Sequence, residues 1–407
     1  MLKKIICSII CLSVWASTYG QALTGSWHGD LEIPGRSLTL VFNLVEGENG
    51  TECTMDSPDE GVKGIPASFS AEGLNVTFEV QSLGVKFTGI NTGKMISGTF
   101  SQRGMSFSLA LKPGRPAVSR PQEPKLPLPY EYKELTIKNG EIELSGTLTL
   151  PDSKDVVIVM VTGSGAQNRN EELFDHKPFL VISDHLAKEG ISTFRYDDRG
   201  TGASTGDFST VTIESNTEDA RSAVRYFRDL GYKKIGLLGH SEGGLLAFIL
   251  ASQNEVDFII SLAGPAANGE TIIMDQNLTA LKQAGYDDEQ IEQLMPQLLG
   301  SVRQQAAANP WIQSFINYEP KSAVEATTCP VLALNGSKDV QVRPDLNLSV
   351  IKEILGEKGN LTAIEYEGLN HLFQHSIGEG ATEYNKIEET ISTQVLDDIT
   401  NWLKTIL

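Results

Sequence analysis

The sequence predicts a small all-β unit followed by a larger α/β unit with a mainly parallel sheet. Residues 22–112 alternate apolar and polar side chains with a period of two, which is typical of half-buried antiparallel strands. From Val156 onward, continuous apolar runs alternate with amphipathic helical segments, which is typical of strands covered on both faces. The length of 407 residues also exceeds that of one ordinary domain and favours two.

The first unit, residues 21–112, is expected to be an antiparallel barrel or sandwich of about eight strands. The alternation is clear in Leu38–Leu44 and in Val76–Val80. Glycine-bearing turns interrupt it every ten or so residues, and a turn of this kind joins neighbouring antiparallel strands. We find no candidate catalytic cluster here, and His28 beside Trp27 is interpreted as a surface or rim residue.

A proline-rich segment, residues 113–132, separates the two units and predicts a stiff, extended linker. The α/β unit is assigned to residues 133–407. It opens with an expected hairpin, in which Asn139-Gly140 supplies the turn.

The α/β unit is expected to have a mainly parallel sheet with helices on both faces. Between Gly264 and Cys329 no strand pattern occurs, and three short helices are expected at 278–284, 288–299 and 302–308. This region, about 265–328, is interpreted as a helical lid inserted into the sheet fold, with simple structural decoration as the alternative. The other expected strands are 156–161, 191–196, 235–238, 258–262, 331–334 and 361–366, and the other expected helices are 178–188, 217–229, 243–252, 344–356 and 384–405.

The motif Gly239-His240-Ser241-Glu242-Gly243 carries the strongest chemical signal. It joins an apolar strand to a helical pattern, so the serine hydroxyl would project from a sharp turn whose flanking positions carry no side chain. We predict Ser241 as a nucleophile; the alternative is a tight turn whose serine only caps the helix. His240 is too close in sequence to be the base and is expected to pack under the turn.

An activated serine needs a base and an orienting carboxylate, in the chain order Ser, Asp or Glu, His. The histidines after the motif are His371 and His375, and His371 directly follows an expected strand. We therefore predict His371 as the base and His375 as a surface residue. Asp339 follows the strand at 331–334 and is predicted as the acid, in preference to Asp345, which is interpreted as part of a helix N-terminus.

Two backbone N–H groups are expected to stabilise an oxyanion. One belongs to Glu242, immediately after the nucleophile, and the other to Ser164 or Gly165 in the loop after the first parallel strand. An ordinary glycine-rich turn is the alternative for that loop. A phosphate-binding loop fits poorly, since no Lys-Ser or Lys-Thr pair follows.

Four further residues are candidates for the substrate pocket. Arg199 could bind a substrate carboxylate, but pairing with Asp197 or Asp198 to hold its loop is the favoured interpretation. The predicted lid carries the aromatic residues Trp311, Phe315 and Tyr318, which could form an apolar pocket wall or the lid's own core.

Taken together, these motifs resemble the α/β-hydrolase superfamily, in its bacterial carboxylesterase branch. The resemblance covers residues 134–407 and rests on the Gly-Ser-Gly loop at 163–165, the Asp-Arg-Gly-x-Gly-x-Ser loop at 198–204 and the Gly-His-Ser-x-Gly-Gly motif at 239–244. It departs from the pattern at Thr162-Gly163, where many relatives have His-Gly. The resemblance implies serine esterase chemistry on a small-molecule ester, with no cofactor and no metal.

Two other functions stay open. Serine peptidases of the prolyl-oligopeptidase or aminopeptidase type share this catalytic fold, although a β unit of residues 21–112 is too short for a large propeller. A non-catalytic envelope-binding protein with a vestigial hydrolase unit is the third possibility. The sequence predicts neither the acyl group nor the oligomeric state.

The net charge and the first 20 residues indicate which binding partners and which cellular location to expect. The net charge of −19 argues against nucleic acid as a partner, because that needs clustered Lys and Arg. Residues 1–20 are interpreted as a signal peptide cleaved near Gly20, so a secreted or periplasmic protein is expected, without a stable membrane span. Cys7 and Cys11 lie within that peptide, and Cys53 and Cys329 are expected to be free.

Overall fold

The computed structural model describes residues 23–34, 36–47, 50–116, 119–150, 152–153, 155–376, 378 and 381–407. The predicted signal peptide, with Cys7, Cys11 and Gly20, lies outside the described residues. The chain divides into two compact units: residues 1–58 with 62–116 form the first, and residues 59–61 with 117–407 form the second.

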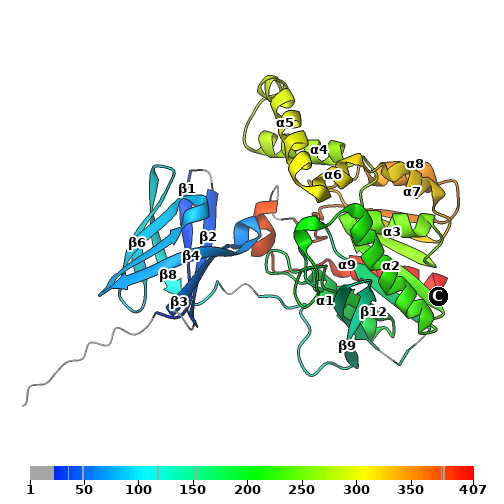
Figure 1. Ribbon diagram of the computed structural model, residues 1–407. Coiled ribbons are helices and arrows are strands. Elements are labelled where there is room, and N and C mark those ends of the chain that lie inside the picture. The colour runs from blue at the N-terminus through cyan, green and yellow to red at the C-terminus, as the bar shows by residue number, and fades with distance from the viewer. Residues whose placement is uncertain are drawn as a thin grey trace, which may run out of the picture. The chain divides into compact units, whose positions relative to one another are not determined.

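The first unit is a closed barrel of eight antiparallel strands, as its alternating pattern predicts (Figure 1). Its inward-facing side chains fill the interior, where Phe42 stacks on Phe78 with ring centroids 4.4 Å apart. Cys53 lies in this core and forms no disulfide. Burial raises the pKa of its thiol to about 11, so the thiol is protonated near neutral pH. The strands are β1 Gly25–Ile33, β2 Arg36–Gly47, β3 Gly50–Ser57, β4 Val62–Glu72, β5 Asn75–Val80, β6 Val85–Asn91, β7 Ile96–Gln102 and β8 Met105–Pro113; the short 3-10 helices are η1 Pro58–Glu60 and η2 Gln81–Leu83.

The second unit contains an eight-stranded sheet in the order β16-β15-β14-β13-β11-β12-β10-β9. The pairs β9–β10 and β10–β12 are antiparallel, and all the others are parallel. The expected hairpin forms, and Gly140 in its turn adopts a positive φ of 61°. The strands are β9 Tyr132–Asn139, β10 Ile142–Thr149, β11 Val156–Val161, β12 Ser192–Tyr196, β13 Lys234–His240, β14 Phe258–Leu262, β15 Val331–Gly336 and β16 Leu361–Tyr366.

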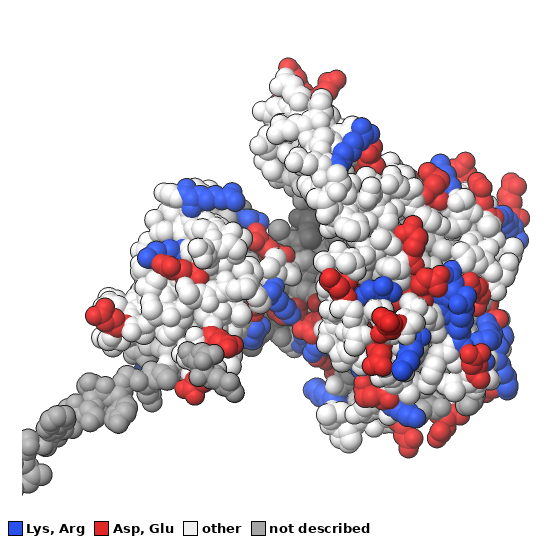
Figure 2. All heavy atoms as spheres, viewed as in Figure 1, with Lys and Arg blue, Asp and Glu red and all other residues white. Residues whose placement is uncertain are grey.

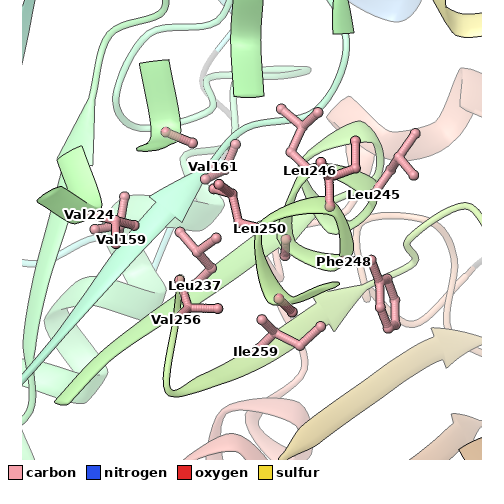
Figure 3. Close-up of a cluster of buried hydrophobic side chains, with 14 of the residues drawn as sticks. Val159, Val161, Val224, Leu237, Leu245, Leu246, Phe248, Leu250, Val256 and Ile259 are labelled. Atoms are coloured by element: carbon pink, nitrogen blue, oxygen red, sulfur yellow. The ribbon is translucent and has the colours of Figure 1, made fainter. Parts of the chain in front are cut away.

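Helices cover both faces of this sheet, so the α/β prediction is confirmed. Strand β11 is buried at every residue because its side chains alternate between two cores: Val157, Val159 and Val161 join the core that includes α2, α3 and α8, and the other three join the core that includes α1 and α9. The central helix α3 is apolar all round and buried, and Figure 3 shows its leucines beside the side chains of β11 and β13.

The observed helices differ from the predicted ones in four places. The helix expected at 278–284, α4, begins at Gly269. The expected helices 288–299 and 302–308 form one helix, α5, which continues through Pro296. The helices α6 and α7 were not expected. The expected helix 384–405 begins only at Thr393, after the 3-10 helix η4 Ala381–Lys386. The helices are α1 Pro178–Lys188, α2 Ile213–Asp229, α3 Glu242–Ser252, α4 Gly269–Gln283, α5 Asp288–Ala308, α6 Pro310–Asn317, α7 Pro320–Ala326, α8 Leu348–Leu355 and α9 Thr393–Ile406, with the 3-10 helix η3 Phe208–Thr210.

Part of the proline-rich segment is bound to the second unit. Arg120 donates to the carbonyl oxygens of Asn385 and Ile387, at 2.9 and 2.8 Å. Gln122 donates to the carbonyl of Ile391 and accepts from the backbone N–H of Thr390. These bonds satisfy polar groups of the segment within the second unit, so the part around Arg120 and Gln122 is not a free linker.

Acidic and basic side chains are interspersed over the visible face of the α/β unit, whereas the lid region of α4 to α6 presents mostly uncharged surface between its few charges (Figure 2). Among the described residues, no helix combines the length and the hydrophobicity that crossing a bilayer requires.

A steric test of the central strand concerns Gly236 in β13. A Cβ atom at this position would lie 2.1 Å from Cε2 of Phe258, whose ring is buried against Trp402. We expect Gly236→Ala to lower the free energy of unfolding by about 1–3 kcal/mol, because the core must shift to admit the methyl group. Urea denaturation measures this loss.

Gly300→Ala is the matched control. Gly300 lies inside α5 with nothing within 4 Å of the added Cβ, so this variant should gain up to about 1 kcal/mol from helix propensity. Equal stability losses in the two variants would contradict the packing argument.

Candidate functional site

The turn between β13 and α3 places Ser241 at the carboxyl end of the sheet. Ser241 has φ 51° and ψ −120°, a positive φ that is rare outside glycine and indicates a strained backbone. Its N–H donates to the carbonyl oxygen of Leu262 at 2.8 Å, which fixes the turn to the neighbouring strand β14.

The two glycines of the motif allow this turn by permitting close backbone contact. A Cβ at Gly239 would lie 2.0 Å from the carbonyl oxygen of Gly243, and a Cβ at Gly243 would lie 2.0 Å from that of Val161. A side chain at Gly239 would therefore push α3 away from β13, and a side chain at Gly243 would push it away from β11. Glu242 is the first residue of α3, so its N–H belongs to the helix end that favours negative charge.

Asp339 and His371 come together after strands β15 and β16. The carboxylate oxygen Oδ2 of Asp339 lies 2.8 Å from Nδ1 of His371, and both side chains are buried. Oδ1 of Asp339 accepts from the backbone N–H groups of Gln341 and Val342, and Asn335 donates to Oδ2 at 3.1 Å. This carboxylate is thus held rigidly and orients the imidazole.

His371 lies beside the turn that carries Ser241. Its ring centroid is 4.7 Å from that of His240, the residue before Ser241. Within the described residues, no hydrogen bond joins the Ser241 hydroxyl to His371. Such bonds are often long without substrate and shorten in the reactive complex.

The other two candidates for acid and base lie on the surface. This was expected of His375, whereas Asp345 was expected at a helix N-terminus and instead lies three residues before α8. His375 is exposed and pairs with Glu389, with 2.8 Å between Nδ1 and Oε2. The carboxylate of Asp345 is exposed and pairs with Arg343.

The loop after β11 is held by two carboxylates, the partly buried Asp198 and the buried Glu171. Asp198 accepts from the hydroxyl of Thr162 at 2.8 Å and from the N–H of Gln167 at 2.9 Å. Glu171 accepts from the N–H of Gly163 at 2.7 Å, so this N–H is occupied. The N–H of Ser164 therefore stays the predicted oxyanion donor, with the N–H of Gly165 as the alternative.

Arg199 does not pair with Asp197 or Asp198, and that interpretation is wrong. Its guanidinium donates to both carboxylate oxygens of Asp219 in α2, at 2.7 and 2.9 Å. Asp197 instead accepts hydrogen bonds from the guanidinium of Arg169, a residue that the sequence did not indicate as its partner. Because Arg199 is engaged in this two-point ion pair, its charge is already compensated.

A cavity of about 550 Å³ adjoins the predicted oxyanion loop. No charged side chain lines it; the lining residues are Ser164, Gly165, Phe208, Ser209, Val211, Ala308, Asn309, Pro310 and Trp311. A larger cavity of about 680 Å³ lies between α4 and α8 and is lined by Asp339 and by charged side chains such as Lys282 and Lys338. Neither cavity is lined by Ser241, but only the uncharged one is lined by the predicted oxyanion loop, so it is the candidate for substrate.

The three aromatic residues of the predicted lid lie in different surroundings. Trp311 lines the uncharged cavity and stacks on Phe315, with centroids 5.4 Å apart. Phe315 is buried in the core of the unit, and Tyr318 lines a separate surface groove with Pro310. The structure therefore places Trp311 alone of the three at the pocket adjoining the oxyanion loop.

The sequence pattern does not predict the roles of Asn216, of Glu171 or of the Glu242 side chain, although it predicts the Glu242 N–H as an oxyanion donor. The buried carboxylate of Glu242 accepts from Nε1 of Trp311 at 2.6 Å and from the amide of Asn216 at 3.0 Å. Burial raises the pKa of this carboxyl, although these two hydrogen bonds lower it in part. Glu171 was also missed; it follows the Gly-rich loop by six positions, and only the fold brings it under Gly163.

Among the described residues, no group of His, Cys, Asp and Glu side chains is arranged to hold a metal ion. Cys329 is free, and burial raises the pKa of its thiol to about 11.

Comparisons with known proteins found similarities to one family model, to an esterase and to solved hydrolase structures. A family model described as "Serine aminopeptidase, S33" matches residues 178–309. Esterase EstD of Thermotoga maritima is 28% identical over 290 residues, which cover 68% of this chain and 68% of that protein. Among solved structures, the Pyrococcus furiosus esterase Pf2001 aligns with a TM-score of 0.48 and 17% identity, over 72% of this chain and 98% of that one. Proline iminopeptidase of Mycobacterium smegmatis aligns with a TM-score of 0.46 and 14% identity, over 67% and 98%.

Asp339 gives a test of the site that needs no knowledge of the substrate. We expect Asp339→Asn to slow the labelling of Ser241 by a fluorophosphonate at least about 100-fold, because the amide would orient His371 in the wrong tautomer. Asp345→Asn removes a carboxylate of the same loop that only pairs with Arg343 on the surface, and should label at the wild-type rate. Equal labelling rates for the two variants would exclude Asp339 as the orienting acid.

Proposed function

We propose that the chain is a serine hydrolase of the α/β-hydrolase superfamily and that it cleaves carboxylic esters through Ser241, His371 and Asp339. The observation that carries the proposal is the buried hydrogen bond between Asp339 and His371, next to a serine on a strained turn. This arrangement supplies a nucleophile, a base and a group that orients the base.

In the proposed reaction, the Ser241 hydroxyl attacks the ester carbonyl carbon while His371 accepts its proton. The N–H groups of Glu242 and Ser164 stabilise the oxyanion of the tetrahedral intermediate. His371 then donates its proton to the leaving alkoxide, which departs as the alcohol and leaves an acyl group on Ser241. Water, activated by His371, hydrolyses that acyl-enzyme and releases the acid.

The choice between ester and peptide substrates rests on the uncharged cavity. An aminopeptidase must bind the free ammonium group of its substrate, and this usually needs a carboxylate facing the pocket. No residue lining the cavity beside Ser164 is charged, and the nearby Glu242 carboxylate already accepts hydrogen bonds on both oxygens. The naming of EstD as an esterase supports the same choice.

The first test removes the nucleophile. We expect Ser241→Ala to lower the turnover of p-nitrophenyl butyrate at least about 1,000-fold, because no other hydroxyl occupies the turn. Ser322→Ala, on the exposed surface of α7, is the control and should keep full activity. The same assay with aminoacyl and dipeptidyl amides should give much lower rates for the wild type. Preferred cleavage of the amides would favour a peptidase, and failure to react with a fluorophosphonate would favour a non-catalytic binding protein.

The second test concerns the pocket. Ala308, the last residue of α5, lines the uncharged cavity, whereas its neighbour Ala307 does not; both are exposed. We expect Ala308→Phe to lower kcat/KM for a hexanoyl ester at least about tenfold and to spare the acetyl ester, because the ring fills the space that a longer chain needs. Ala307→Phe should change neither value. A parallel loss for both esters in Ala308→Phe would place the acyl chain elsewhere.

A further inference from the structure

Three segments of the site meet at one buried carboxylate and one buried imidazole. Oε1 of Glu171 accepts from the N–H of Gly163 at 2.7 Å and lies 2.9 Å from Nδ1 of His240. The other ring nitrogen, Nε2 of His240, lies 3.0 Å from the carbonyl oxygen of His371. The pair thus connects the oxyanion loop, the turn that carries the nucleophile and the loop that carries the base.

Both partners are removed from water. Glu171 is 0% exposed and His240 4% exposed. Glu171 also has a positive φ of 51°, so its backbone adopts an unfavourable conformation in this position. A buried charge needs a partner, and here each of the two groups is the partner of the other.

The hydrogen-bond partners define the protonation state of His240. The carbonyl oxygen of His371 can only accept, so Nε2 must carry a hydrogen. The Glu171 oxygen accepts from Gly163 and faces Nδ1, so Nδ1 must carry a hydrogen as well when Glu171 is ionised. A ring that donates from both nitrogens is an imidazolium.

The surrounding charges agree with this state. Burial alone lowers the pKa of His240, but the Glu171 carboxylate, the hydrogen bonds to Glu171 and to the His371 carbonyl, and the charge of Asp339 together raise it above the ordinary value. Asp198, which holds the other side of the oxyanion loop, is a further carboxyl close enough to interact with Glu171.

We propose that Glu171 and an imidazolium His240 form a positioning pair, which holds the oxyanion loop, the Ser241 turn and the His371 loop in their reactive arrangement. The pair touches no reacting atom and acts through the backbones of Gly163 and His371. The role in turnover rests on the proposed esterase function, whereas the charged state of the pair does not.

The proposal has a consequence at high pH. When His240 loses its proton, one ring nitrogen can no longer donate, and the bond to Glu171 or to the His371 carbonyl is lost. The activity of the wild type should therefore fall at alkaline pH, as the pair deprotonates. Removal of the Glu171 charge should move this fall to lower pH, because the carboxylate no longer stabilises the imidazolium.

The first experiment uses the unmodified protein. NMR of the full chain with ¹⁵N-labelled histidine, assigned by comparison with His240→Asn, should show His240 with both nitrogens protonated at pH 7.5. In Glu171→Gln the same signal should be that of a neutral ring. A neutral His240 in the wild type at pH 7.5 would overturn the proposal, whatever the activity.

The second experiment measures ester hydrolysis over a range of pH. We expect His240→Asn and Glu171→Gln each to lower kcat by about 100-fold with KM changed less than about twofold, because a misplaced base or oxyanion donor slows the reaction without removing the pocket. In Glu171→Gln the alkaline fall of the remaining activity should move down by at least about one pH unit. Thermal denaturation of each variant checks that it is folded.

The pair His375 and Glu389 provides a matched control, since it has the same imidazole–carboxylate contact on the exposed surface. His375→Asn and Glu389→Gln should leave kcat and the pH profile unchanged. Folded His240→Asn and Glu171→Gln proteins with wild-type kcat would overturn the positioning role. If Ser241→Ala kept full activity while His240 was still an imidazolium, the proposed esterase mechanism would fail and the charged pair would stand.

Discussion

The close approach of helix α3 to strand β11 is the constraint on which the site depends. A Cβ at Gly243 would lie 2.0 Å from the carbonyl oxygen of Val161, so only glycine allows the helix to start so near the sheet. The apolar helix behind this contact is buried all round, and its burial compensates the strained backbone of Ser241. A serine at the tip of such a turn is exposed to a substrate while its backbone cannot relax.

The loops around this turn are shaped by buried and partly buried carboxylates rather than by regular secondary structure. Asp339 holds His371, Asp198 holds the start of the oxyanion loop, and Glu171 binds that loop to His240. Each carboxylate accepts at least two hydrogen bonds, which offsets the cost of removing its charge from water. Loops built in this way keep a fixed geometry although few of their residues belong to strands or helices.

In the proposed function, the predicted lid contributes the part of the site that selects a substrate. Trp311 lines the uncharged cavity and also donates to the Glu242 carboxylate. The residue that is expected to stabilise the oxyanion through its backbone is therefore bonded to the lid through its side chain. This bond links the position of α6 to the first turn of α3, so the pocket wall and the oxyanion donor are fixed together.

The two units, the parallel sheet and the strand–turn–helix at Ser241 can be predicted from the sequence, because periodicity and glycine spacing are local signals. The loop positions of Asp339 and His371 also follow from their strands, and the fold brings the two side chains together. Other features depend on contacts between distant segments and could not be predicted: the partners of Arg199, the separate environments of Trp311, Phe315 and Tyr318, and the pairing of Glu171 with His240. Glu171 and His240 are 69 residues apart, and no local pattern encodes which distant side chain fills a buried polar contact.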